Sequence, residues 1–89
     1  MIRVRVLVSG DVQGVFFRQS TMEQARIRGV TGWVRNRDDG RVEAVFEGPE
    51  GAVDELVAWA REGTPWASVR DVAVEREEPE GIEGFEIRG

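Results

Sequence analysis

A glycine-containing segment that ends in an arginine is the part of this sequence best suited to chemistry. It reads Gly10-Asp11-Val12-Gln13-Gly14-Val15-Phe16-Phe17-Arg18. Glycine lets the main chain approach a ligand closely, so successive amides from Gln13 to Phe17 can point into one concavity. Arg18 adds a planar guanidinium whose donors match phosphate oxygens. The segment therefore predicts an anion site, while the same residues also suit a tight turn beside a solvated arginine.

The residue types that are missing narrow the chemistry further. The sequence contains neither Cys nor His. Thiolate nucleophiles, disulfides and serine–histidine hydrolysis are therefore excluded, and the commonest metal ligand is absent. No Asp-x-Asp-x-Asp-Gly loop offers a carboxylate cation site, so we expect no metal and no cofactor. Any catalysis must use arginine, carboxylates, amides, hydroxyls and backbone groups.

Asn36 is the only asparagine in the sequence. Its amide offers one acceptor and two donors, so it can hold a water molecule without ionising. Asparagine is also common beside hairpins, because it tolerates unusual backbone angles. The residues alone leave both roles open.

Alternation and helical spacing predict the elements that must position these residues. Apolar residues alternate over residues 2–9, which is typical of a strand with one buried face. Helical spacing follows from about residue 15 to residue 28. Two further strands, at residues 32–36 and 41–47, are separated by Asp38-Asp39-Gly40, a sequence that suits a hairpin.

The second half of the chain repeats this order. A second helix is predicted from about Glu50 to Gly63, because it carries an apolar stripe at helical spacing formed by Val53, Leu56, Val57 and Ala60. Strands are predicted at residues 69–76 and 85–87. The order β-α-β-β-α-β with a terminal strand predicts a ferredoxin-like α/β (α+β) sandwich, with two helices on one face of an antiparallel sheet of four to five strands. Many unrelated functions occur on this fold.

Size and charge limit the partners. With 89 residues the chain is long enough for a single domain, residues 1–89, and a net charge of −5 argues against nucleic acid. All twelve basic residues are arginine. No apolar run reaches the length of a membrane span, and the N-terminal residues lack a signal-peptide pattern. We therefore expect a cytoplasmic protein that does not enter membranes.

Two segments resemble the signatures of the acylphosphatase family. Residues 10–18 match the first, G-x-V-Q-G-V-x-[FY]-R, at every specified position. Gly32-Trp33-Val34-Arg35-Asn36, followed by Gly40, Val42 and Gly48, resembles the second. The order of the motifs, the chain length and the closing Phe85-Glu86-Ile87-Arg88 also fit, so the resemblance covers nearly the whole chain.

The resemblance implies a function for each motif. It implies that the amides of residues 13–18 cradle a phosphoryl group, that the Arg18 guanidinium binds it, and that Asn36 orients the attacking water. It also implies metal-independent hydrolysis of carboxyl–phosphate anhydrides, with a small acyl phosphate as substrate and inorganic phosphate as product. Nothing in the sequence demands more than a monomer.

A ferredoxin-like sheet is also found in two other classes of protein. An RNA-binding sheet needs exposed aromatic residues on its central strands and a basic surface, and the strand at residues 41–47 offers neither. A non-catalytic ferredoxin-like module that binds phosphate or another anion through the same loop stays open.

The remaining aromatic and charged residues are assigned ordinary structural roles. We expect Phe16 and Phe17 to pack the loop against the core, and Trp33 and Trp66 to be buried or half-buried. Arg35 and Arg37 are expected on a solvated strand face. The acidic stretch over residues 75–83 is expected to be solubilising.

Overall fold

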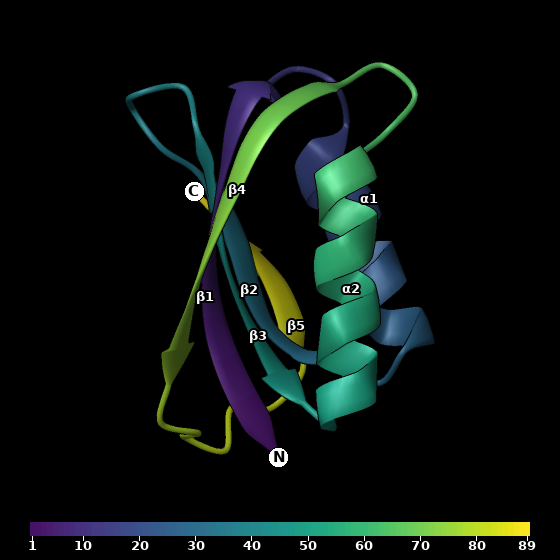
Figure 1. Ribbon diagram of the computed structural model, residues 1–89, viewed down its shortest axis with the longest axis vertical. Helices are drawn as coiled ribbons and strands as arrows, with labels where there is room; N and C mark the ends of the chain where they lie inside the picture. Colours follow the sequence, from purple (N-terminus) through teal and green to yellow (C-terminus); the bar gives the residue numbers. More distant parts are fainter.

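The structure, a computed structural model, describes all residues from 1 to 89 and consists of a sheet covered by two helices (Figure 1). In chain order its elements are β1 (Ile2–Asp11), α1 (Phe17–Ile27), β2 (Thr31–Asn36), β3 (Val42–Gly48), α2 (Glu50–Glu62), β4 (Ser68–Glu77) and β5 (Phe85–Arg88). The sequence predicted each element to within about two residues at either end. The architecture is the predicted ferredoxin-like α+β sandwich.

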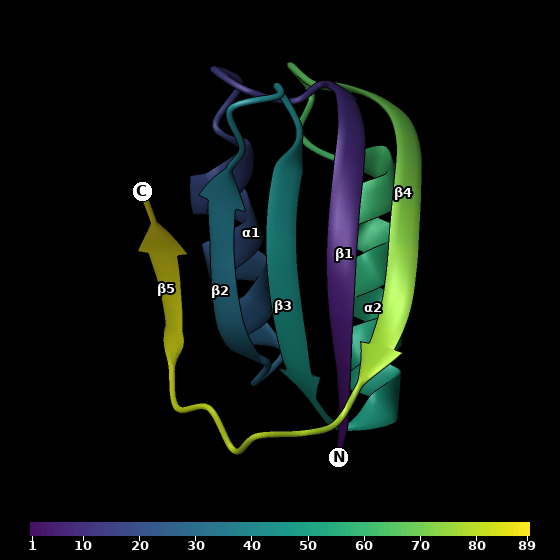
Figure 2. The ribbon, with the colours of Figure 1, turned by 90° about the vertical axis from the view of Figure 1, so that its left-hand side faces the viewer.

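The sheet is mixed rather than antiparallel, which corrects the sequence-based prediction. Its strand order is β4-β1-β3-β2-β5, and β5 runs parallel to β2. Figure 2 shows the reason: β4 ends at the lower end of the sheet, where β2 begins, and the chain passes along that end to the far side of β2 before it enters β5. The other strand pairs are antiparallel.

The hydrophobic core lies between the sheet and the helices. Val4, Val6 and Val8 of β1 face it, as their alternation predicted. In α2 the predicted apolar stripe is also confirmed, since Val53, Leu56 and Ala60 are all buried, while Val57 is partly buried. Neither helix is long and apolar enough to span a membrane.

The opposite face of the sheet is covered by charged side chains instead of being left to solvent. Arg3 is only 5% exposed, and its guanidinium bonds to Glu77 at 3.1 Å and to Glu47 at 3.4 Å. Arg5 also bonds to Glu77, at 2.8 Å. The hydrogen bonds from Arg5 and Arg3 lower the pKa of Glu77 below its usual range. Charged residues thus bind β1 to both of its neighbours.

The acidic stretch over residues 75–83 therefore does more than solubilise the protein. The carboxylate of Glu47, 1% exposed, accepts hydrogen bonds from the amides of Glu80, Gly81 and Ile82 at 2.8, 2.8 and 3.1 Å. The bond from the Glu80 amide is the main reason why the pKa of Glu47 lies below its usual range despite burial. Glu47 thereby holds the segment that leads into β5.

Candidate active site

The loop between β1 and α1, residues 12–16, depends on the two glycines that the sequence singled out. Gly10 has φ 125°, and a Cβ placed there would lie 2.2 Å from the carbonyl oxygen of Ser68 on β4. The β1–β4 register shifts at this point, between Ser9 and Gly10. Gly14 has φ 74° in the middle of the loop. Both angles favour glycine, so the glycines set how the chain leaves the sheet.

The main-chain amides of this loop and of the first turn of α1 are free. No amide from Gln13 to Gln19 donates a hydrogen bond to another group of the chain. The first amides of a helix lack an acceptor inside the helix and lie at its positive end. Such a group of donors is suited to bind an anion.

Phe16 has the only positive φ of any non-glycine residue, with φ 61° and ψ 22°, directly before α1. The prediction that its ring packs against the core was wrong, because Phe16 is 65% exposed. Phe17 was predicted correctly: it is 3% exposed and its ring lies 5.5 Å from that of Trp59. The left-handed turn at Phe16 separates the two neighbouring rings.

Arg18 lies in the first turn of α1 and is half-buried. Of the twelve arginines in the chain, only Arg18 and Arg70 make neither a hydrogen bond nor a salt bridge. A half-buried guanidinium without an acceptor is available to an anionic ligand.

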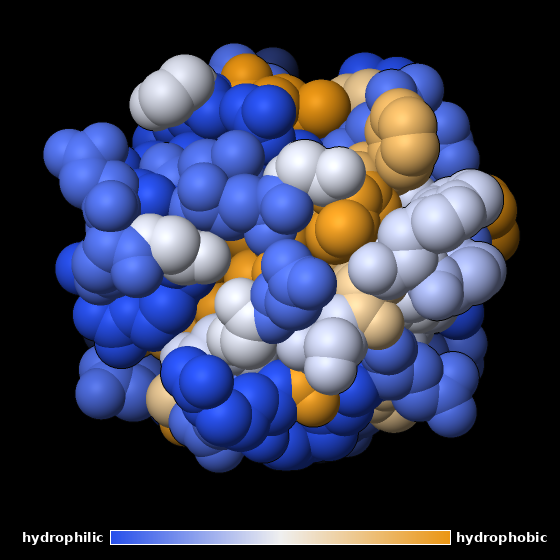
Figure 3. All heavy atoms as spheres, turned by 90° about the horizontal axis from the view of Figure 1, so that it is seen from above, coloured by the Kyte–Doolittle hydropathy of each residue, from blue (hydrophilic) through white to orange (hydrophobic).

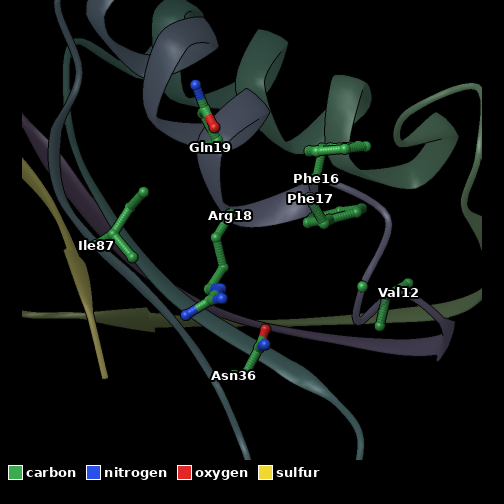
Figure 4. A pocket seen from close by; sticks show the side chains of 8 residues that line it. Val12, Phe16, Phe17, Arg18, Gln19, Asn36 and Ile87 are labelled. Carbon is green, nitrogen blue, oxygen red and sulfur yellow. The ribbon is translucent and has the colours of Figure 1, made fainter.

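Asn36 is the last residue of β2 and lies on the helix-facing side of that strand, two residues after the buried Val34. Its Oδ1 is buried and has no hydrogen-bond partner. Figure 4 shows the side chains of Asn36 and Arg18 pointing toward one another. A buried acceptor without a partner normally calls for a ligand or a water molecule.

These features surround one pocket of about 320 Å³. Its lining residues are Val12, Gly14, Phe16, Phe17, Arg18, Gln19, Asn36 and Ile87. Five of the seven residues assigned from the sequence therefore meet here. The other two, Gln13 and Val15, contribute to the loop without lining the pocket. Sequence reasoning missed Val12, Gln19 and Ile87, which are apolar or carry no distinctive pattern.

Two side chains fix the loop from opposite sides. The Gln13 amide donates to the carbonyl oxygens of Arg37 and Arg41, at 2.8 and 3.0 Å, and so ties the loop to the hairpin that follows Asn36. The hydroxyl of Thr64, 5% exposed, donates to the carbonyl oxygen of Val15 at 2.9 Å. Thr64 had no signal in the sequence beyond its place after a predicted helix.

The hairpin is braced on the other face of the sheet. Glu43 accepts from Arg35 at 2.6 Å and from Arg37 at 3.5 Å, so these two arginines are paired rather than simply solvated. Burial alone would raise the pKa of Glu43, but the hydrogen bonds from Arg35 and Arg5 hold it below its usual range. These ion pairs with Glu43 thereby fix the end of β2, which carries Asn36, from the face of the sheet opposite the helices.

The loop of residues 12–16, the β2–β3 hairpin and the α2–β4 connection lie together at one end of the molecule (Figure 1), and Val12, Gly14 and Phe16 of that loop line the pocket. Seen from that end, hydrophobic side chains gather near the middle and toward one edge, with hydrophilic ones around them (Figure 3). No three or more carboxylates are grouped so that they could hold a metal ion. Fold and site together define a ferredoxin-like protein with a pocket bordered by free main-chain amides and an unpaired arginine.

Comparison with known proteins makes this assignment specific. The family model described as Acylphosphatase matches residues 4–87. A protein named acylphosphatase from Haloquadratum walsbyi is 67% identical over 86 residues, which cover 97% of this chain and 92% of that protein. The crystal structure of acylphosphatase from Bacillus subtilis is 42% identical, with a TM-score of 0.97 and full coverage of both chains. The chain belongs to the acylphosphatase family.

The same fold occurs inside a much larger protein. The crystal structure of full-length HypF in its phosphate- and nucleotide-bound form matches all of this chain with a TM-score of 0.84. The match covers 12% of the HypF chain at 23% identity, and at that level the likeness is one of fold.

Proposed function

We propose that this chain hydrolyses the carboxyl–phosphate bond of acyl phosphates to a carboxylate and inorganic phosphate. One observation carries the proposal. Free amides, an unpaired arginine and a buried amide oxygen without a partner all border the same pocket. Membership of the acylphosphatase family supports the same reaction.

The phosphoryl group binds where the free donors gather. The amides of residues 13–18 surround its oxygens, and the Arg18 guanidinium binds it from the first turn of α1. Phosphoryl transfer is catalysed chiefly by positioning and by stabilising charge on the equatorial oxygens. Donors already held in place do this without reorganising during the reaction.

Asn36 places the attacking water. Its buried Oδ1 accepts a hydrogen bond from that water and holds it in line with the bond to be broken. The water oxygen bonds to phosphorus as the bond from phosphorus to the acyl oxygen breaks. The acyl group leaves as a carboxylate, which is a good leaving group, and the proton of the water passes to phosphate or solvent. The absence of histidine is therefore no obstacle.

The decisive experiment measures phosphate release from acetyl phosphate and benzoyl phosphate in excess EDTA. The wild-type protein is expected to turn over both substrates, and Asn36→Ala to lose most of kcat while it still binds inorganic phosphate. Gln24→Ala, which removes a side-chain amide elsewhere on α1, is the matched control. Phosphate binding without turnover by the wild type would instead identify a non-catalytic anion module.

We further infer that residues 1–89 act as one domain, as a monomer, in the cytoplasm. A single continuous core of 16 residues supports one domain. Light scattering tests the oligomeric state and is expected to give a mass near 10.0 kDa. Fractionation of cells that express the full chain tests the location.

A further inference from the structure

Two aromatic rings stand exposed beside the pocket. Phe16 and Trp66 are each 65% exposed, and their rings meet edge to face with centroids 5.5 Å apart and an interplanar angle of 67°. They come from different loops, since Trp66 belongs to the connection between α2 and β4. The sequence-based expectation that Trp66 is buried or half-buried was wrong. The same expectation was correct for Trp33, which is 8% exposed and lies beneath the guanidinium groups of Arg5 and Arg88.

This aromatic pair is held in place by the structure around it. The positive φ of Phe16 directs its ring out of the core. The bond from the buried Thr64 hydroxyl to the Val15 carbonyl joins the two loops next to the rings, and the Ala67 amide bonds to the Thr64 carbonyl at 3.0 Å. Exposed large aromatic residues that are fixed in this way point to contact with a ligand.

The pair lies where the acyl part of a substrate is expected. Attacking and leaving oxygens are in line across phosphorus, so the acyl group leaves on the side opposite Asn36. Asn36 projects from β2, and in Figure 4 Phe16 and Asn36 lie on opposite sides of the labelled group of pocket residues. Phe16 itself lines the pocket, and the Trp66 ring, which does not line it, packs against the Phe16 ring.

We propose that Phe16 and Trp66 form an acyl-binding wall, which makes the enzyme prefer acyl phosphates with an aromatic or other apolar acyl group over acetyl phosphate. The inference rests on the proposed function, because it assumes that the phosphoryl group occupies the loop. The wall offers ring faces and edges and no charged side chain, so it selects by apolar and aromatic contact.

The test compares kcat/KM for benzoyl phosphate with kcat/KM for acetyl phosphate. We expect Trp66→Ala to lower this ratio by about two- to tenfold, the range of one aromatic contact, chiefly through a higher KM for benzoyl phosphate. Comparison of variant with wild type cancels the different intrinsic reactivities of the two substrates. Trp66→Phe is expected to recover most of the loss. Phe16→Asn, which removes the ring but tolerates the left-handed backbone, is expected to lower the ratio as well.

Ile27→Ala is the matched control, because Ile27 is a 75% exposed apolar residue at the far end of α1. It is expected to leave the ratio unchanged, and circular dichroism checks that every variant is folded. An unchanged ratio in folded Trp66→Ala and Phe16→Asn overturns the acyl-binding wall alone, provided that the wild type hydrolyses both substrates. If the wild type hydrolyses neither, the proposed function fails and the wall fails with it.

Discussion

Replacement of Arg18 by alanine separates the chemistry of the site from the stability of the fold. The Arg18 side chain makes no hydrogen bond or salt bridge, so its removal breaks none. Arg18 also places a positive charge in the first turn of α1, which contains no acidic residue. A cation near the positive end of a helix is unfavourable by about 0.3–1 kcal/mol. We therefore expect the free energy of unfolding of Arg18→Ala to be unchanged or raised by up to about 1 kcal/mol.

The effect on activity has the opposite sign. Loss of one preorganised donor to a developing charge typically costs about 10²–10³ in rate, or about 2.7–4 kcal/mol, and loss of a phosphate-binding arginine can cost more. We expect kcat/KM for benzoyl phosphate to fall by at least this factor, and inhibition by inorganic phosphate to weaken. Arg18→Lys keeps the positive charge but loses the planar guanidinium, so its activity is expected to lie between that of the wild type and that of Arg18→Ala.

Arg70→Ala is the matched control, because Arg70 is the other arginine without a partner and its removal changes the net charge equally. Turnover is followed by the absorbance of benzoyl phosphate, and stability by urea unfolding with tryptophan fluorescence. Unchanged kcat/KM in folded Arg18→Ala would refute the role assigned to Arg18. An equal loss in Arg70→Ala would show that overall charge, and not the pocket, controls the rate.

Three further predictions concern the support of the site. Gln13→Ala removes two bonds to hairpin carbonyls and is expected to cost about 1–3 kcal/mol in urea unfolding and to lower kcat. Gly10→Ala places a Cβ 2.2 Å from the Ser68 carbonyl oxygen at a positive φ, so its melting temperature is expected to fall by several degrees. The lowered pKa of Glu47 means that its contribution to stability is present above the ordinary glutamate pKa of about 4.3 and is lost as pH falls through the lowered value. Glu47→Gln is expected to lower the free energy of unfolding at neutral pH and to make it depend less on pH in the acid range. It is also expected to speed hydrogen exchange in Phe85–Arg88. A free energy of unfolding equal to that of the wild type at pH 7 would contradict this prediction.

The parts of the site that the sequence predicted depend on local chemistry. The positions of Gly10 and Gly14 mark a strand-to-helix connection with unusual angles, and the alternation in β1 fixes which face is buried. The position of Asn36 could be predicted because its strand ends just before the hairpin residues Asp38-Asp39-Gly40. Such features are set by a few neighbouring residues, so a pattern is enough to find them.

The parts that the sequence did not predict depend on contacts between distant segments. The parallel pairing of β5 with β2 follows from the path of residues 78–84 across the sheet, which Glu47 holds from another strand. The exposure of Phe16 follows from a single positive φ. Arg3 on β1 and Glu47 on β3 are polar residues, and their burial is explained by ion pairs between strands and by the bonds from the amides of residues 80–82 to Glu47.

Charge in this protein is divided between structure and chemistry. Most arginines are paired, several of them across the open face of the sheet, where they join its strands and brace the hairpin. Arg18, in contrast, stays unpaired at a helix end where a positive charge is unfavourable. The buried Oδ1 of Asn36 likewise has no hydrogen-bond donor. Because both unfavourable features border one pocket, they are best explained by a ligand that relieves them. A phosphoryl group for Arg18 and a water molecule for Asn36 do so together, and their juxtaposition is the arrangement that hydrolysis requires.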